Sequence, residues 1–209
     1  MTALAAYEAG LRLGEGCWVS WRGSRRALPL ERWLAEADAT DDALIDCCTG
    51  PTLDVGCGPG RLVAALAARG RVALGIDVSA EAVRIGTARG AAVLRGDVFG
   101  PVPSAGRWGH VLLADGNVGI GGDVIALLGR CAELLRPGGT VVVEVEGPGT
   151  GHVDQVLDVI GPGGHRGPLR WARVGADSVA ALAAAAGLVL HVLHSTPGRH
   201  VAVLGAARP

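Results

Sequence analysis

One segment constrains the fold more than any other. An apolar run at residues 52–55 leads into a glycine-rich turn at residues 56–60, and a stretch with helical spacing of apolar residues follows at 61–69. Glycines let a backbone turn sharply and approach a ligand without an intervening Cβ atom. The start of the next helix offers unpaired N–H groups and the positive end of its dipole. The segment therefore predicts a strand–turn–helix unit whose turn holds a negative or zwitterionic group.

The same alternation of strand and helix continues along the chain. Such short alternation is typical of parallel βαβ units, so we expect an α/β fold with helices on both faces of a mostly parallel sheet. The helix expected at 123–136 should end at Pro137-Gly138-Gly139. A further helix is expected at 177–186, and a hairpin of residues 188–193 and 200–204 should follow it. The expected strands are 52–55, 71–76, 92–95, 111–114 and 140–146, and the helices between them are 61–69, 80–89 and 123–136.

Two parts of the chain depart from this regular pattern. Residues 1–50 contain three of the five tryptophans, and we expect them to form an N-terminal helical cap on a main domain of residues 51–209. Its helices are expected at 2–13, 30–37 and 40–48, with residues 17–28 irregular or extended. Residues 147–175 are rich in glycine and proline, and we expect a long irregular connection there.

Composition excludes several classes of protein. The formal net charge is -1 and the basic residues are all arginine, so the sequence predicts no basic face for nucleic acid. The five cysteines are odd in number and lack paired spacing, which predicts no metal site and no disulfide framework. With no signal peptide and no apolar run long enough to span a membrane, the expectation is a cytoplasmic protein with reduced thiols.

The spacing of the glycines discriminates between ligands. A dinucleotide-binding turn reads G-x-G-x-x-G, whereas this turn reads Gly56-Cys57-Gly58-Pro59-Gly60 and follows Asp54. It resembles the first motif of the class I S-adenosylmethionine-dependent methyltransferases, commonly D-x-G-x-G-x-G. The resemblance implies a Rossmann-like doubly wound sheet with an antiparallel last strand, and S-adenosylmethionine as the cofactor. It implies cofactor contacts at Asp54, Gly56, Cys57, Gly58 and Gly60.

Further cofactor contacts are expected where the next strands end. Asp77 lies about 20 residues after the first glycine, where an acidic residue suits a ribose diol; Ser79 is the better candidate to cap the next helix. By resemblance, Val78 packs on the adenine, Asp97 accepts from its amino group and the Val98 N–H donates to the ring. Asp115 and Asn117 follow the fourth strand, where the family binds the methionine part of the cofactor and the substrate.

Methyl transfer to oxygen or nitrogen can require a general base. The sequence offers Asp115, His152 and His165 as candidate catalytic residues, the two histidines because they lie in the expected irregular connection. His110 and the histidines of the terminal hairpin are interpreted as structural or solvent-facing. Tyr7, Trp18, Trp21 and Trp171 are candidates for a lid over the substrate or for plain packing of the cap.

The expected activity is methyl transfer to a small or medium-sized metabolite. The sequence identifies neither the acceptor atom nor the oligomeric state. Alternatives left open are a nicotinamide-dependent oxidoreductase, a transferase of another group from a related cofactor, and a non-catalytic S-adenosylmethionine-binding protein. A DNA amino-methyltransferase is disfavoured because Ala114-Asp115-Gly116-Asn117 lacks the Pro-Pro-aromatic motif of those enzymes.

Overall fold

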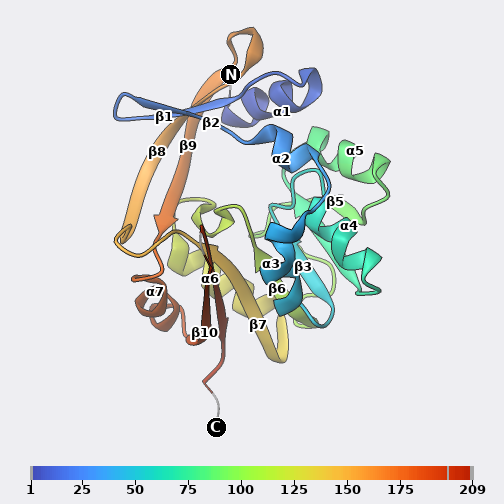
Figure 1. The fold of residues 1–209 in the computed structure, drawn as a ribbon, viewed down its shortest axis with the longest axis vertical. Helices are drawn as coiled ribbons and strands as arrows, with labels where there is room; N and C mark the ends of the chain where they lie inside the picture. The colour runs from blue at the N-terminus through green and yellow to red at the C-terminus, as the bar shows by residue number, and fades with distance from the viewer. Residues whose placement is uncertain (1, 197, 208–209) are drawn as a thin grey trace.

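A seven-stranded sheet forms the centre of the molecule (Figure 1). The computed structural model describes residues 2–196 and 198–207. The strands of this main sheet lie in the order β10-β11-β7-β6-β3-β4-β5. Their bounds are β3 (Thr52–Val55), β4 (Ala73–Asp77), β5 (Val93–Arg95), β6 (Trp108–Leu113), β7 (Leu135–Val145), β10 (Val189–Thr196) and β11 (Arg199–Gly205).

Parallel pairing brings the carboxyl ends of β3 to β7 to one edge. β3 pairs in parallel with both β4 and β6, with Asp54 beside Gly75 on one side and Leu112 on the other. β11 is antiparallel to both of its neighbours. All of β3 is buried, as expected of a central strand covered on both faces. The expected Rossmann-like sheet with its antiparallel last strand is confirmed.

Helices cover both faces of this sheet. On one face, α6 and α7 pack through a continuous apolar cluster that includes Leu127, Leu128 and Leu182. On the other face, α3 and α4 pack on the sheet through Leu44 and Leu66. The bounds of these helices are α3 (Asp42–Cys47), α4 (Arg61–Ala68), α5 (Ala80–Ala88), α6 (Val124–Leu134) and α7 (Val179–Ala185).

A second, four-stranded sheet stands over the carboxyl edge of the main sheet, and we call it the accessory sheet (Figure 1). Its order is β2-β1-β8-β9, with β1 antiparallel to β8 so that Val19 lies beside Val159. Its strands are β1 (Trp18–Trp21), β2 (Ser24–Ala27), β8 (His152–Ile160) and β9 (Arg166–Val174).

The expectation of an irregular connection over residues 147–175 is therefore wrong. Most of this segment is the hairpin β8–β9, joined by the short 3-10 turn η3 (Pro162–Gly164). Burial alternates through β8, from His152 to Val159, with the period of two that a half-buried strand requires. The flanking glycines and prolines mark the ends of the hairpin and hide this pattern in the overall composition.

The N-terminal residues combine helices with strands. α1 (Ala3–Leu13) packs on β8 and β9, and α2 (Leu30–Leu34) and the 3-10 turn η1 (Ala39–Asp41) lead to α3. The expected cap thus contains three α-helices, and also a β1–β2 hairpin at residues expected to be irregular or extended. A functional division at residue 50 stays a prediction.

At the other end of the chain, β10 and β11 form the expected terminal hairpin; Pro197 of its turn lies outside the described residues. No helix in the described part of the chain combines the length and apolar character needed to cross a membrane.

The accessory sheet packs tightly on the main domain at the loop after β6. Residues Ile120 and Trp171 form a β-bridge between the loop after β6 and strand β9. Gly119, at the end of the 3-10 turn η2 (Asn117–Gly119), lies so close to β9 that an added Cβ would meet the Ala172 carbonyl oxygen at 2.1 Å. A backbone atom cannot swing aside as a flexible side chain can, so this position requires glycine.

We therefore expect Gly119→Ala to lower the free energy of unfolding by about 1–3 kcal/mol, the usual cost of overpacking. The matched control is Gly129→Ala on α6, where an added Cβ meets nothing within 4 Å. Better helix propensity should leave this control as stable as the original chain or stabilise it by up to ~1 kcal/mol. Urea denaturation measures both, and equal stability of Gly119→Ala and the original chain would contradict the close docking.

Candidate active site

One large cavity of about 1140 Å³ lies between the carboxyl edge of the main sheet and the accessory sheet. Single ligand pockets usually have about 300–1,000 Å³, so this cavity has room for more than one small molecule. We call the part lined by residues 54–58, 77–78 and 96–98 the cofactor edge. We call the rest, beneath the accessory sheet, the chamber.

The glycine turn shapes the cofactor edge. Gly56 and Gly58 have φ values of 70° and 53°, a left-handed conformation that other residues rarely adopt. The Gly58 N–H donates to Asp77 Oδ2 at 2.9 Å, and the Ser79 N–H donates to Asp77 Oδ1 at 2.8 Å. These bonds fix the Asp77 carboxylate in the cavity wall, and each oxygen keeps a lone pair for a ligand hydroxyl.

Gly60 has a different position from the other turn glycines. It does not line the cavity, and its φ of 75° starts α4. An added Cβ there would approach Ala91 and Val93, each at 3.0 Å. Gly60 therefore allows the helix to pack against the β4–β5 region, and the structure does not bring it to the cavity.

The adenine-side residues come together as expected. Val78, Asp97 and Val98 all line the cavity at the ends of β4 and β5. Asp97 Oδ1 accepts from the Phe99 N–H at 3.0 Å, and Arg130 Nε donates to the Val98 carbonyl at 2.9 Å. The Asp97 carboxylate, the apolar Val78 side chain and the backbone at Val98, which Arg130 holds in place, fit the adenosyl part of S-adenosylmethionine. Cys57 and Asp54 also line this edge.

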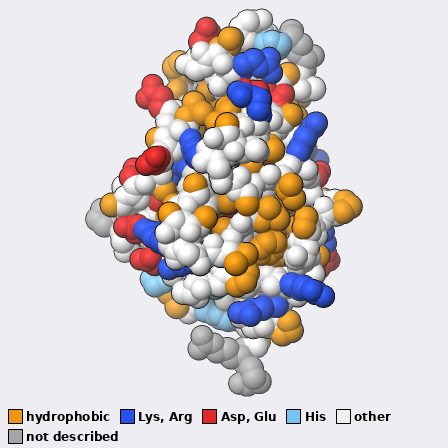
Figure 2. Space-filling view, turned by 90° about the vertical axis from the view of Figure 1, so that its right-hand side faces the viewer, with side chains coloured by type: hydrophobic (Ala, Val, Ile, Leu, Met, Phe, Trp, Pro, Cys, Tyr) orange, Lys and Arg blue, Asp and Glu red, His pale blue; other side chains and the backbone are white. Residues whose placement is uncertain are grey.

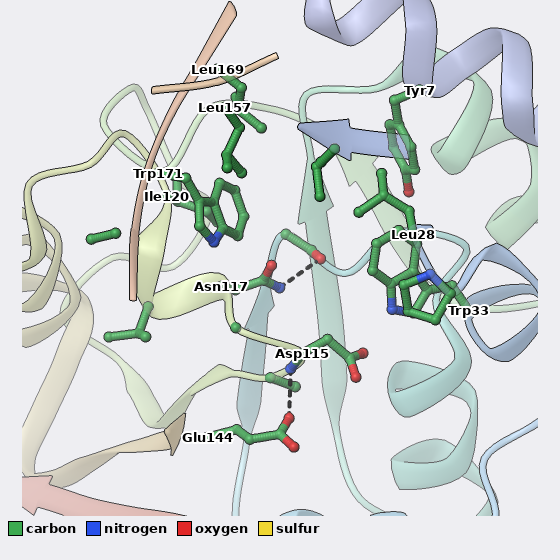
Figure 3. A pocket seen from close by; sticks show the side chains of 18 of the residues that line it. Tyr7, Leu28, Trp33, Asp115, Asn117, Ile120, Glu144, Leu157, Leu169 and Trp171 are labelled. Carbon is green, nitrogen blue, oxygen red and sulfur yellow. Dashed lines mark hydrogen bonds between the residues drawn. The ribbon is translucent and has the colours of Figure 1, made fainter. Parts of the chain in front are cut away.

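The floor of the cavity, where the cofactor edge meets the chamber, is polar (Figure 3). Asn117 Nδ2 donates to the carbonyls of Val55 and Gly56, both at 2.9 Å, and so ties η2 to the glycine turn. The Asp115 N–H donates to Glu144 Oε2 at 2.6 Å. Asp115 has a φ of 52°, and this left-handed backbone places its carboxylate at the junction of the two parts.

An ionic network supports this junction from below. Arg61 is buried and donates to Asp41 and, at 2.7 Å, to Asp115 Oδ2. Arg199 from β11 lies 3.1 Å from Asp41 and 3.0 Å from Glu144. Because burying charges is costly unless each is paired, the network holds all five side chains in one arrangement. Arg32 of α2 adds a further bond to Asp41 at 2.7 Å.

Burial changes the acidity of several carboxyl groups here. Burial, with the charge of Asp115, raises the pKa of Asp54 to about 7. Burial likewise raises the pKa of Asp77 and that of Glu144. Asp41 differs, because burial would raise its pKa but hydrogen bonds and charge from Arg61 and a hydrogen bond from Arg199 outweigh this and lower it.

The three candidate catalytic residues do not meet in space. Asp115 lines the cavity, whereas His152 and His165 do not. His152 begins β8 and its Nε2 lies 3.0 Å from Asp154 Oδ1, while His165 follows η3 at the far end of the same hairpin. The geometry gives neither histidine a place at the cavity, because the hairpin carries them away from it.

Sequence reasoning missed several cavity residues. Arg61, Glu144 and Trp33 line the cavity, as does His200, whose Nδ1 lies 3.0 Å from Ser195 Oγ. The position of Glu144 near the carboxyl end of a predicted strand was an available signal.

The candidate lid residues divide between two faces. Tyr7, Trp21 and Trp171 line the cavity. Trp18 does not, and the Arg25 guanidinium lies 4.7 Å from the centre of its ring.

Comparison with known proteins agrees with this geometry. Residues 52–139 match the model of a family described as Methyltransferase domain. Fold and site together resemble those of Rossmann-like methyltransferases. The family match covers residues 52–139, and the fold of the remaining chain is also the one that S-adenosylmethionine-dependent methyltransferases have. No curated protein matches it in sequence.

Solved structures share the fold at low sequence identity. A SAM-dependent methyltransferase from Bacteroides fragilis, in complex with S-adenosyl-L-homocysteine, has a TM-score of 0.79 and 20% identity over 99% of this chain and 94% of its own. The glycopeptide N-methyltransferase MtfA, complexed with S-adenosylmethionine, has a TM-score of 0.63 and 15% identity over 82% and 88%. The O-methyltransferase NcsB1 from neocarzinostatin biosynthesis, in complex with S-adenosyl-L-homocysteine and 1,4-dihydroxy-2-naphthoic acid, has a TM-score of 0.57 and 23% identity over 83% and 52%.

The raised pKa of Asp54 predicts how the free energy of unfolding depends on pH. The pKa of Asp54 is about 7 in the folded chain and near 3.9 in the unfolded chain. At pH values between these two, Asp54 keeps a proton in the folded state that it loses in the unfolded state. Its contribution to stability is present at low pH and is lost as pH rises from about 4 to 7. Relative to Asp54→Asn, the original chain should lose roughly 2–4 kcal/mol of unfolding free energy over this range.

Denaturant unfolding at a series of pH values measures this difference. Asp46→Asn is the control, because Asp46 is an exposed carboxylate on α3. A stability difference from Asp54→Asn that stays constant with pH would show that Asp54 is ionised throughout.

Proposed function

We propose that this chain transfers the methyl group of S-adenosylmethionine to a small or medium-sized metabolite held in the chamber. The observation that carries the proposal is a single cavity that joins the cofactor edge to a chamber roofed by the accessory sheet. A cofactor at the edge and an acceptor in the chamber would meet at the floor, where Asp115 and Asn117 lie (Figure 3).

The protein's contribution in this proposal is orientation. When bound, S-adenosylmethionine supplies a methyl group on a sulfonium; the carbon–sulfur electron pair stays with sulfur, an acceptor lone pair forms the new bond, and the acceptor gives up its proton. Holding two reactants in line is worth roughly 7–11 kcal/mol of the barrier. Asp77 and the glycine turn would fix one reactant, and the chamber walls the other.

Asp115 is the candidate that the geometry favours for contact at the reacting end. Its carboxylate lines the junction, while Arg61 and the backbone bond to Glu144 hold it in place. We assign it a contact with the methionine part of the cofactor or with the acceptor. Its pairing with Arg61 favours a role in holding charge over one in removing a proton, because Asp115 Oδ2 already accepts a hydrogen bond from Arg61.

A small acceptor is favoured over nucleic acid by the surface as well as by the chamber. Arg side chains on the face shown in Figure 2 are spread in separate groups with no continuous basic area. Nucleic-acid binding depends on a concentrated positive field. The G-x-G-x-G spacing also disfavours a nicotinamide cofactor.

The cysteines support a reducing compartment, and we propose the cytoplasm. All five are free, and four of them are buried. Disulfides form and persist mainly in oxidising compartments.

Calorimetry with S-adenosylhomocysteine and with NAD tests the proposed function. The chain should bind S-adenosylhomocysteine more tightly than NAD. Asp77→Asn should weaken that binding by about tenfold or more, because it removes a charged acceptor facing the ribose. The control is Asp46→Asn, which lies outside the cavity. A preference for NAD, or equal affinities of Asp77→Asn and the original chain, would contradict the proposal.

A further inference from the structure

We propose that the acceptor is a flat, largely apolar molecule built around an aromatic ring system and lacking phosphate. This inference rests on the proposed methyl transfer and concerns only the chamber. Three observations carry it: the inward face of the accessory sheet, the distribution of aromatic residues along the chain, and the pairing of the charges that line the cavity.

The accessory sheet presents an apolar face to the chamber. Alternate residues of each strand point to one side of a sheet, and on β1, β8 and the first part of β9 the residues that line the cavity are separated by two positions. At the end of β9, residues 171–174 all line it. The intervening residues Trp18, Val156 and Arg170 do not line it. The apolar residues at the alternating inward positions are Val19, Trp21, Leu157, Val159, Leu169 and Trp171.

The opposite wall is also apolar, and it comes from a distant part of the chain. Tyr7, Leu28 and Trp33 from the N-terminal segment face Ile120 and Trp171 across the cavity (Figure 3). The rings of Tyr7 and Trp33 pack edge to face, with centroids 6.0 Å apart. This pair gives the second wall a defined shape, since each ring restricts the other.

Aromatic residues are rare in this chain and gather at the cavity. The chain has five tryptophans, one tyrosine and one phenylalanine, and four of these seven line the cavity. The three others are Trp108 in the core, Trp18 on the outer face of the accessory sheet, and the exposed Phe99. Aromatic walls favour a planar ligand, because rings attract one another in stacked and edge-to-face arrangements.

The charges that line the cavity argue against an anionic acceptor. Arg61 and Arg173 are each bonded to carboxylates, Arg61 to Asp115 and Arg173 to Glu146. The remaining arginines in the described lining, Arg25 and Arg26, are exposed on the edge strand β2. A phosphate in the chamber would therefore compete with existing ion pairs.

The polar floor sets the direction of the acceptor. Asp115 and Glu144 lie at one end of the apolar walls (Figure 3). A ring-bound hydroxyl or amine would face this end, and its lone pair would form the bond to the methyl carbon. The carbon–sulfur pair passes to sulfur and the acceptor's proton passes to water, so the step needs no further reactant.

The test measures binding of three probes to the chain saturated with S-adenosylhomocysteine, by calorimetry. The probes are naphthol, decanol and methyl glucoside. Naphthol should bind at least about tenfold more tightly than methyl glucoside, and more tightly than decanol, because only naphthol is both apolar and planar. Methyl glucoside or decanol binding as tightly as naphthol would overturn the proposal.

Trp171→Leu should weaken naphthol binding by about fivefold or more through loss of a ring contact, and Trp171→Phe should retain most of it. Trp18→Leu is the matched control, because Trp18 belongs to the same sheet and lies on its outer face. The affinity for S-adenosylhomocysteine, measured in parallel, should be unchanged in all three variants and reports that each is folded. Equal naphthol affinities of Trp171→Leu and Trp18→Leu would overturn the assignment of this wall.

The same measurements separate the proposed methyl transfer from the proposed aromatic acceptor. Failure of the original chain to bind S-adenosylhomocysteine counts against the proposed function. Tight S-adenosylhomocysteine binding without a preference for naphthol counts against the aromatic acceptor alone.

Discussion

The pairing of β1 with β8 decides whether the carboxyl edge of the main sheet is an open groove or a roofed chamber. These strands lie more than a hundred residues apart in the sequence, and their antiparallel register places Val19 beside Val159. The Ile120–Trp171 bridge then fixes the paired sheet against the loop after β6. The turn, the floor and the chamber walls become one site only because this second sheet is in place.

The charged groups beneath the site connect segments that are distant in sequence. Arg61 follows the glycine turn, Asp41 precedes α3, Asp115 follows β6 and Arg199 begins β11. Replacing such a network by apolar residues of similar size is often neutral or stabilising in other proteins. Its value here is positional, because it sets the direction of the Asp115 carboxylate at the junction of cofactor edge and chamber. At Asp54, burial and the charge of Asp115 disfavour the ionised form more strongly than the charge of Arg61 favours it.

The parts of the fold that local sequence controls could be predicted. The turn at residues 56–60 needs left-handed glycines, and parallel strands in a buried sheet need continuous apolar runs, so both left clear signals. The positions of Asp77 and Asp97 at the cavity follow from the same regularity, since Asp77 ends β4 and Asp97 lies just after the end of β5. The accessory sheet could not be found this way, because β1 has only four residues and its partner lies far along the chain. His152 and His165 were misplaced for the same reason: without the β8–β9 pairing, nothing in the sequence shows that they lie away from the cavity.

A crystal structure of the chain with S-adenosylhomocysteine tests the central claim most directly, namely that cofactor and acceptor occupy separate parts of one cavity. The ribose should contact Asp77, the adenine should lie beside Val98, and the space between Trp33 and Trp171 should stay free of the nucleoside. A nucleoside bound between those two tryptophans, or an accessory sheet separated from the loop at Ile120, would contradict the account.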